Sequence, residues 1–285
     1  MRAQFIDFWY YFKQNRGALA GLAVIFIFFI TALLAPLFAP HNPAQIFPEH
    51  LLQRPFFFSE QINLFLGSDD VGRDLLSRLI YGARISMGIG LLVVIFSTSI
   101  GTMLGLISGY VGGRIDWFIM RVVDMMMSLP SILLAIFVVS VLGPNLLNGI
   151  IAVSVVAVPS FIRIVRASVL EEKKRQYVMA SQTFGSSHWR ILFINIFPNV
   201  LAPLIVQATL GFSDGILNAA ALGFLGLGAQ PPTAEWGTML ADSRAYIESA
   251  PWLVTLPGLC ILMVVLAFNL LGDGLRDAFD PRLKK

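Results

Sequence analysis

The sequence predicts an all-α integral membrane protein whose helices cross the bilayer six times. Of its 285 residues, 56% are hydrophobic and only 13% are charged, and the mean hydropathy is +0.76. These values exceed what the core of a soluble protein needs. Apolar windows of about twenty residues, the length that crosses a bilayer core of about 30 Å, recur along the chain. Since alternating β-strand patterning is absent, we expect a helical bundle rather than a barrel.

The expected spans are residues 19–38, 85–110, 117–142, 147–165, 200–222 and 253–271. The first window follows Lys13 and Arg16, as the apolar region of a signal peptide would. It is too long for such a region, and its end, "LLAPLFAPHNP", carries prolines where a cleavage site needs small residues. We therefore expect an uncleaved membrane anchor.

The distribution of Lys and Arg predicts the orientation of the spans. The segments expected outside hold Arg54, Arg73, Arg78, Arg84 and Arg244, and the rest lie in segments expected inside, a ratio of about three to one. Both termini are thus expected in the cytoplasm. The net charge of +3 reflects this topology and does not indicate nucleic-acid binding.

These spans divide the chain into one membrane domain with short flanks. We expect a cytoplasmic segment over 1–18, the first transmembrane helix over 19–38 and a periplasmic segment over 39–84. The transmembrane core is expected over 85–271, with a cytoplasmic coupling loop at 167–199, and a cytoplasmic tail over 272–285.

Two external segments have local signals of their own. The first ends in "LGSDDVGRDLLSRLIYGARIS", where Asp69 or Asp70 is expected to cap a short helix on the outer membrane surface. The second joins the last two spans, and its Trp236 and Trp252 are expected at the membrane interface.

The sequence offers no catalytic, cofactor or metal site. Cys260 is the only cysteine, and His41, His50 and His188 have no carboxylate cluster beside them. There is no Walker-type glycine loop and no arrangement of nucleophile and base. If this protein moves a solute uphill, its energy must come from elsewhere.

The polar stretch "EEKKRQYVMASQTFGSSHWRILFINIFPN" (171–199) interrupts this apolar sequence. Helical spacing places the large side chains Leu170, Tyr177 and Phe184 on one face. The small residues Ala180 and Ser181 lie on the same face. Gly185 suits the left-handed residue that ends such a helix, and Ser186 or Ser187 can cap the next helix, which leads to Pro198. The residues alone leave open whether this is a rigid elbow that docks a partner or an ordinary surface loop.

This loop resembles the coupling loop of bacterial ABC importer permeases. The family pattern is Glu-Ala-Ala, three residues, Gly, nine residues, Ile, one residue, Leu-Pro. Met179, Ala180, Ser181, Gly185, Asn195, Phe197 and Pro198 occupy its positions here. The departures are Met179 for the acid, Ser181 for the second alanine and Asn195 for the isoleucine, beside which Ile196 lies.

Four further stretches carry the same resemblance. "LGSDDVGRDLLSRLIYGARIS", "GLISGYVGGRIDWFIMRVVDMMMSLPSILLAI", "ALGFLGLGAQPPTAEWGTML" and "LAFNLLGDGLRDAFDPRL" resemble the second membrane subunit of dipeptide and oligopeptide importers, most of all the dipeptide permease. The resemblance implies a six-helix type I ABC importer permease and a homologous permease subunit beside it. It also implies two ATP-binding subunits, which hold the ATP and Mg, and a periplasmic peptide-binding protein that delivers the peptide. Contact with the ATPase is then expected at Tyr177, Ala180, Ser181, Phe184, Gly185 and Pro198.

Two rival functions follow from other features. An ion-coupled secondary transporter would need acids within its spans, and only Asp124 and Asp214 qualify. Asp124 is expected to pair with Arg121 one turn away. Asp214 is expected to face protein or a water-filled cavity, either as a translocation-path residue that attracts a peptide amine or as a partner of a second subunit. An intramembrane enzyme, the other rival, would need a nucleophile or metal constellation that the spans lack.

Overall fold

The long helices of this chain form a bundle with distinct structures at its two ends. The structure, a computed structural model, describes residues 9–58 and 63–279. Its helices are α2 (Arg16–Leu33), α3 (Ala35–Phe38), α4 (Leu75–Val111), α5 (Gly113–Met127), α6 (Ser131–Leu142), α7 (Leu146–Glu172), α8 (Gln176–Thr183), α9 (His188–Arg190), α10 (Phe197–Phe224), α11 (Trp236–Ser243) and α12 (Trp252–Phe279). A π-helical segment, Ile191–Ile196, precedes α10, and a 3₁₀ turn, Arg244–Tyr246, follows α11. The strands β1 (Phe57–Phe58) and β2 (Asn63–Leu64) pair antiparallel, with Phe57 opposite Leu64.

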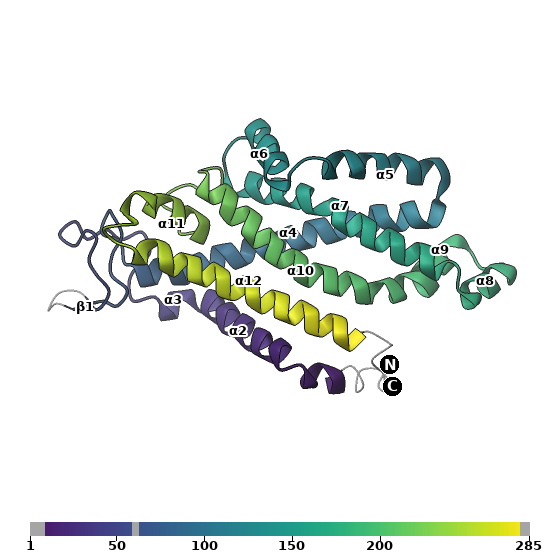
Figure 1. The fold of residues 1–285 in the computed structure, drawn as a ribbon, viewed down its shortest axis with the longest axis horizontal. Coiled ribbons are helices and arrows are strands. Elements are labelled where there is room, and N and C mark those ends of the chain that lie inside the picture. Colours follow the sequence, from purple (N-terminus) through teal and green to yellow (C-terminus); the bar gives the residue numbers. More distant parts are fainter. Residues whose placement is uncertain (1–8, 59–62, 280–285) are drawn as a thin grey trace.

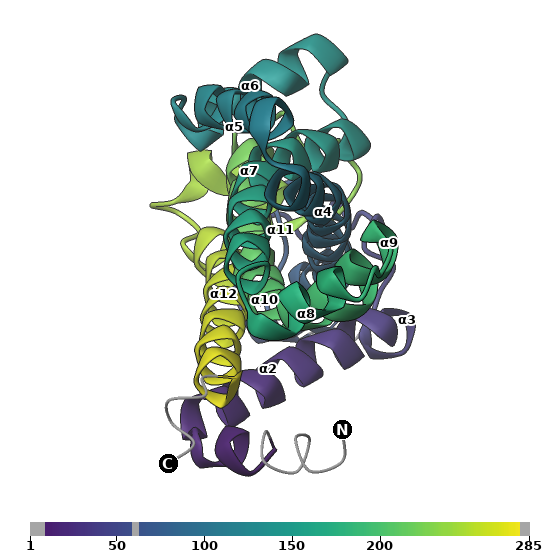
Figure 2. The ribbon, with the colours of Figure 1, turned by 90° about the vertical axis from the view of Figure 1, so that its right-hand side faces the viewer.

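The bundle has two ends, which we name after the segments predicted to lie there: the external end carries the segments expected outside, and the coupling end carries the loop at 167–199. Figure 1 shows α11 and the β hairpin at one end of the bundle and α8 and α9 at the other, where α2 begins and α12 ends. Figure 2, which looks onto the end that carries α8, shows α7, α10 and α4 in the middle. In that view α12 and α2 lie below them, and α5 and α6 lie above.

The third predicted span, 117–142, is wrong as a single straight helix. Among residues 9–58 and 63–279, five helices are long and apolar enough to cross a membrane, and a sixth span results only if α5 and α6, bent by 97° at residues 128–130, count together. Pro130 explains the break, because proline removes a backbone N–H and disfavours helical geometry in the residue before it. The charged face of α5 is held on α7, where Arg166 donates two hydrogen bonds of 2.5 and 2.7 Å to Asp116.

Helix α4 extends far beyond its predicted span. It contains 37 residues, which corresponds to a length of about 56 Å. The expected short surface helix after Asp70 is wrong, since residues 75–80 are the first turns of α4 itself. Its cap is Asp74, whose carboxylate accepts a hydrogen bond of 3.1 Å from the Ser77 N–H. Helix α7 is similarly long, about 40 Å for its 27 residues, so it extends past the predicted span ending at residue 165.

Glycines allow α4 and α7 to pack in direct backbone contact. Gly101, Gly105 and Gly109 follow one another at four-residue spacing on α4 and face α7. A Cβ atom at Gly105 would lie 2.7 Å from the Val165 Cβ, and one at Gly109 would lie 2.8 Å from the Val169 Cβ. Side chains at these positions would force the two helices apart.

We expect Gly105→Ala to destabilise the chain by about 1 to 3 kcal/mol, the usual cost of an extra methyl group in a filled interior. Gly88→Ala is the matched control, because it adds the same group to the same helix where a Cβ would meet nothing within 4 Å. The measurement is the apparent melting temperature of each full-length variant in nanodiscs. Equal melting temperatures for the two variants would contradict the close packing of α4 on α7.

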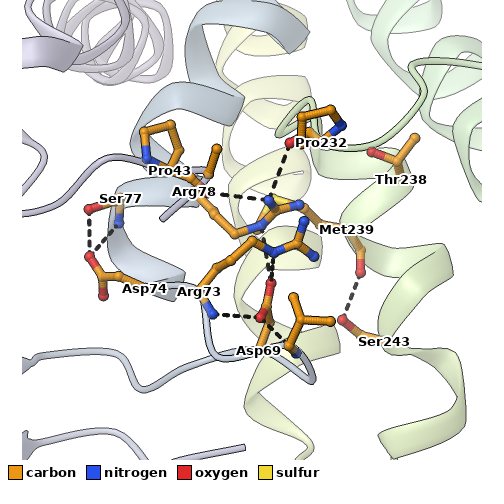
Figure 3. A network of polar contacts seen from close by, with 12 residues as sticks. Pro43, Asp69, Arg73, Asp74, Ser77, Arg78, Pro232, Thr238, Met239 and Ser243 are labelled. Carbon is orange, nitrogen blue, oxygen red and sulfur yellow. Dashed lines mark hydrogen bonds and ion pairs between the residues drawn. The ribbon is translucent and has the colours of Figure 1, made fainter. Parts of the chain in front are cut away.

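A buried polar cluster fastens the external end of the bundle (Figure 3). Asp69 accepts a hydrogen bond of 2.6 Å from the Arg73 Nε and pairs with the Arg78 Nε at 3.5 Å. Arg78, only 2% exposed, also donates to the carbonyl oxygens of Pro43 and Pro232. The cluster therefore joins the external segment, the start of α4 and the connection between α10 and α11.

The predicted interfacial position of Trp236 is wrong. This side chain is fully buried, and its Nε1 donates a hydrogen bond of 3.1 Å to the Leu79 carbonyl oxygen. It lies at the start of α11, a helix that the sequence did not predict. Glu235 caps α11 by accepting hydrogen bonds from the Gly237 and Thr238 N–H groups, and burial raises the pKa of its carboxyl. The external connection is thus a helix folded back onto the bundle rather than a surface linker.

Candidate coupling site and membrane cavity

Helix α8 is a separate short helix between the ends of α7 and α10. Helix α7 ends at Glu172 and α8 begins at Gln176. Leu170 therefore belongs to α7, and its expected place on the same helical face as Tyr177 is wrong. Gly185 has a φ of +74°, and the N–H groups of Gly185 and Ser186 donate to the carbonyl oxygens of Gln182 and Ser181. This pattern is a Schellman motif, which confirms that Gly185 ends the helix.

One face of α8 is anchored and the other is exposed. Val178 is fully buried in a cluster with Val169, Ile191, Ile196 and Val200, which belong to α7, the π-helical segment and α10. Ala180 is exposed on the outer side of α8, and Phe184 is 88% exposed. Met179 on the same helix and Trp189 in α9 are also exposed. Large apolar side chains left exposed at one end of the bundle mark a candidate surface for protein contact.

Tyr177 connects α8 to two long helices through its hydroxyl group. The hydroxyl donates a hydrogen bond to the Glu172 carboxylate at the end of α7. It also accepts one of 3.0 Å from the Asn199 Nδ2 at the start of α10. Partial burial and the neighbouring Glu172 raise the pKa of Tyr177 to about 12, so the hydroxyl stays protonated at neutral pH. We refer to Glu172, Tyr177 and Asn199 as the hinge triad.

A second set of contacts connects this region to α4. The Lys173 Nζ donates a hydrogen bond of 2.7 Å to the Tyr110 carbonyl oxygen. The Tyr110 hydroxyl lies 2.8 Å from the His188 Nδ1. Ser187 caps the next helix by accepting from the Arg190 N–H, as one of the two predicted serines was expected to do. Side-chain contacts thus join the loop to α4, α7 and α10.

The remaining predicted residues of the loop have more local roles. The Ser181 hydroxyl donates a hydrogen bond of 3.0 Å to the Ser186 hydroxyl across the Schellman turn. Pro198 lies in the first turn of α10, directly after the π-helical segment. The structure brings the predicted loop residues together at one end of the bundle and places Asp214 away from them in α10, a helix long and apolar enough to cross a membrane.

Asp214 lines a cavity of about 290 Å³ between α6, α7 and α10. The polar residues that share this cavity are Ser131, Ser160, Gln207 and Asn218. The Asn218 Nδ2 donates a hydrogen bond of 2.8 Å to the Asp214 carbonyl oxygen. The sequence had singled out Asp214 by its charge but not these uncharged neighbours, which only helix packing brings beside it.

The predicted pairing of Asp124 with Arg121 is wrong. Asp124 instead accepts a hydrogen bond of 2.6 Å from the Arg163 guanidinium of α7.

The sequence analysis did not identify two residues of the hinge triad, Glu172 and Asn199, because their residue types and positions are typical of ordinary surface residues. Asn199 stands four residues after Asn195 at the start of an apolar helix, a spacing that could have drawn attention to it.

The fold is that of a known class of membrane protein. Residues 101–285 match the family of binding-protein-dependent transport system inner membrane components. Residues 3–55 match the N-terminal TM domain of oligopeptide transport permease C. The chain belongs to the family of binding-protein-dependent inner membrane components, and it is an ABC importer permease of the inner membrane.

Individual relatives cover almost the entire chain. It is 52% identical over 280 residues to the dipeptide transport system permease protein DppC of Haemophilus influenzae, covering 98% of this chain and 95% of the relative. It is 56% identical over 280 residues to DppC of Escherichia coli K12, covering 98% and 93%. One chain of the inward-facing MetNI methionine ABC transporter superposes with a TM-score of 0.62 at 19% identity, covering 72% of this chain and 98% of that one. At this identity the last similarity shows the fold alone, and it confirms the predicted all-α permease architecture.

Proposed function

We propose that this chain is a membrane subunit of an importer that moves dipeptides or short oligopeptides from the periplasm to the cytoplasm by alternating access. The observation that carries the substrate class is the identity of 52 to 56% with dipeptide permeases along nearly the full chain. The all-helical bundle supplies the membrane path, and α8 supplies a contact outside it.

The proposal assigns the ATPase contact to α8. Ala180 and Phe184 supply the exposed surface, and Val178 fixes this helix on the bundle. The hinge triad then transmits movement of α8 to α7 and α10. ATP and Mg are bound by two partner subunits, so this chain is not itself an enzyme and carries no cofactor.

The same proposal places the other partners. A homologous permease subunit completes the membrane path, and a periplasmic binding protein delivers peptide to the end that carries α11. Both termini lie in the cytoplasm. The support for this orientation is that the start of α2 and the end of α12 lie at the same end of the bundle as α8 (Figure 1), together with the bias of Lys and Arg toward that end.

The test is peptide uptake by the complete transporter reconstituted in proteoliposomes with its binding protein. We expect uptake of a dipeptide that requires ATP, stops when ATP hydrolysis is blocked with vanadate and survives the collapse of ion gradients by ionophores. Uptake driven by an ion gradient without ATP would contradict the proposal and support a secondary transporter.

A further inference from the structure

Three polar residues and a glycine of α10 form a stripe along the face that lines the cavity. Gln207, Gly211, Asp214 and Asn218 follow one another at intervals of four, three and four residues, which places them on one side of a helix. The same residues line the cavity, opposite Ser160 of α7 and Ser131 at the start of α6. The stripe therefore faces a space inside the protein and not the packed core.

Asp214 is the only ionisable residue among those that line this cavity. Within residues 9–58 and 63–279, its carboxylate has no hydrogen-bond or ion-pair partner, although its side chain remains exposed to open space. An ionised group inside a membrane helix is costly and is normally retained for a ligand, a proton or a partner charge. Its polar neighbours in the cavity are hydroxyls and amides, and the rest of the lining is apolar, so the cavity offers one negative charge beside neutral hydrogen-bonding groups.

We propose that this cavity binds the protonated α-amino group of the peptide in transit, an inference that rests on the peptide-import function proposed above. A primary ammonium group has three N–H donors and needs a negative charge nearby. The Asp214 carboxylate supplies the charge, and the oxygen atoms of Ser131, Ser160 or Gln207 supply further acceptors. The cavity volume of about 290 Å³ is at the lower limit of small-molecule binding sites. The cavity therefore holds only the amino end of the peptide, and the rest of the peptide extends toward the partner permease.

A contrasting role for Asp214 is an ion pair with a cation of the homologous permease subunit. The two roles differ in what the charge affects. An assembly contact would alter the amount of intact complex or the uptake of all substrates equally. A substrate contact would alter only the preference for substrates with a free amine.

The experiment compares a dipeptide with an analogue in which a hydroxyl replaces the α-amino group. Uptake of both is measured in the reconstituted complete transporter with saturating ATP, per amount of assembled complex. The ratio of kcat/KM for the two substrates is compared between the wild type and Asp214→Asn. Any preference of the binding protein enters both ratios equally and therefore cancels. Asp214→Glu keeps the charge, and Glu248→Gln removes a carboxylate that is exposed at the external end.

We expect Asp214→Asn to lower the preference for the free amine about tenfold, the lower part of the range for a hydrogen bond to a charged group. Asp214→Glu should retain most of the preference, and Glu248→Gln all of it. An unchanged ratio in Asp214→Asn, an equal loss for both substrates or a failure of the complex to assemble would each overturn the proposal. Failure of the proposed function itself appears separately, as a wild-type transporter that takes up no dipeptide with ATP.

Discussion

Ala180→Arg is expected to abolish ATP-driven peptide uptake, lowering its rate at least about a hundredfold. Ala180 is exposed on the outer face of α8, opposite the buried anchor Val178. A long cation at the centre of a docked interface leaves a desolvated, unpaired charge, which costs several kcal/mol. In the unassembled chain the same arginine remains in water, so folding and membrane insertion should not change.

The measurement combines peptide uptake with the amount of membrane-inserted chain and of co-purified ATP-binding subunits. Gln182→Arg is the matched control, since residue 182 is exposed and lies about 200° around the helix from residue 180. We expect the control to retain uptake and co-purification. Normal uptake in Ala180→Arg would show that this face of α8 docks nothing.

Tyr177→Phe is expected to uncouple ATP hydrolysis from transport while leaving the complex intact. The substitution removes a hydroxyl that bonds to Glu172 of α7 and to Asn199 of α10, but keeps the ring that packs beside them. A hydrogen bond to a charged group contributes about 1.5 to 3 kcal/mol, so we expect the peptide transported per ATP to fall about tenfold. Removing the hydroxyl leaves α8 docked but loosely connected to the membrane helices.

A double-mutant cycle tests whether Tyr177 and Asn199 act together, which a single variant does not show. Asn199→Ala should produce a similar loss, and the Tyr177→Phe, Asn199→Ala pair should cost less than the sum of the two single changes. Tyr246→Phe is the control, because Tyr246 directly follows α11, which Figure 1 shows at the opposite end of the bundle from α8. If losses in the pair are additive, or if ATP hydrolysis falls in parallel with uptake, the triad does not transmit motion.

Features that depend on local chemistry were predictable from the sequence. The apolar windows follow from the length needed to cross a bilayer. Four of them lie within the long helices of the structure, whereas the first extends past the end of α2 into α3 and the third is bent. Gly185 was predicted, and Ser187 was one of two predicted serines, because a left-handed turn and a helix cap each require particular residue types at one position. The position of Ala180 on the docking face was predicted from its helical spacing to Tyr177 and Phe184 on the same short helix.

Features that depend on contacts between distant segments were not predictable. Asp124 has Arg121 one turn away in sequence, but the packing of α5 on α7 brings Arg163 closer. Trp236 resembles an interfacial residue until α11 folds back and places it against Leu79. Asp74 caps α4 in place of the nearby Asp69, because Asp69 is occupied by two arginines of the external cluster.

In the candidate sites, too, the features set by local residue types were predictable and those set by contacts between distant segments were not. The sequence identified α8 because its polar, small residues interrupt an apolar chain, but it could not reveal that the Tyr177 hydroxyl joins three elements. Likewise, it singled out Asp214 as a charge in a membrane helix, whereas the cavity with Ser131 and Ser160 depends on how α6 and α7 pack. Charge and composition indicate where function lies, and tertiary contacts determine how it is carried out.

The most direct test of the central claim, that α8 docks an ATP-binding subunit, is site-specific photocrosslinking in the assembled transporter. A benzophenone amino acid is incorporated at the Ala180 position and, as a control, at the Glu248 position near the opposite end of the bundle. We predict a crosslinked product with an ATP-binding subunit from position 180 and none from position 248. A product from position 180 that contains only the homologous permease subunit or lipid, in a complex that still hydrolyses ATP, would contradict the account.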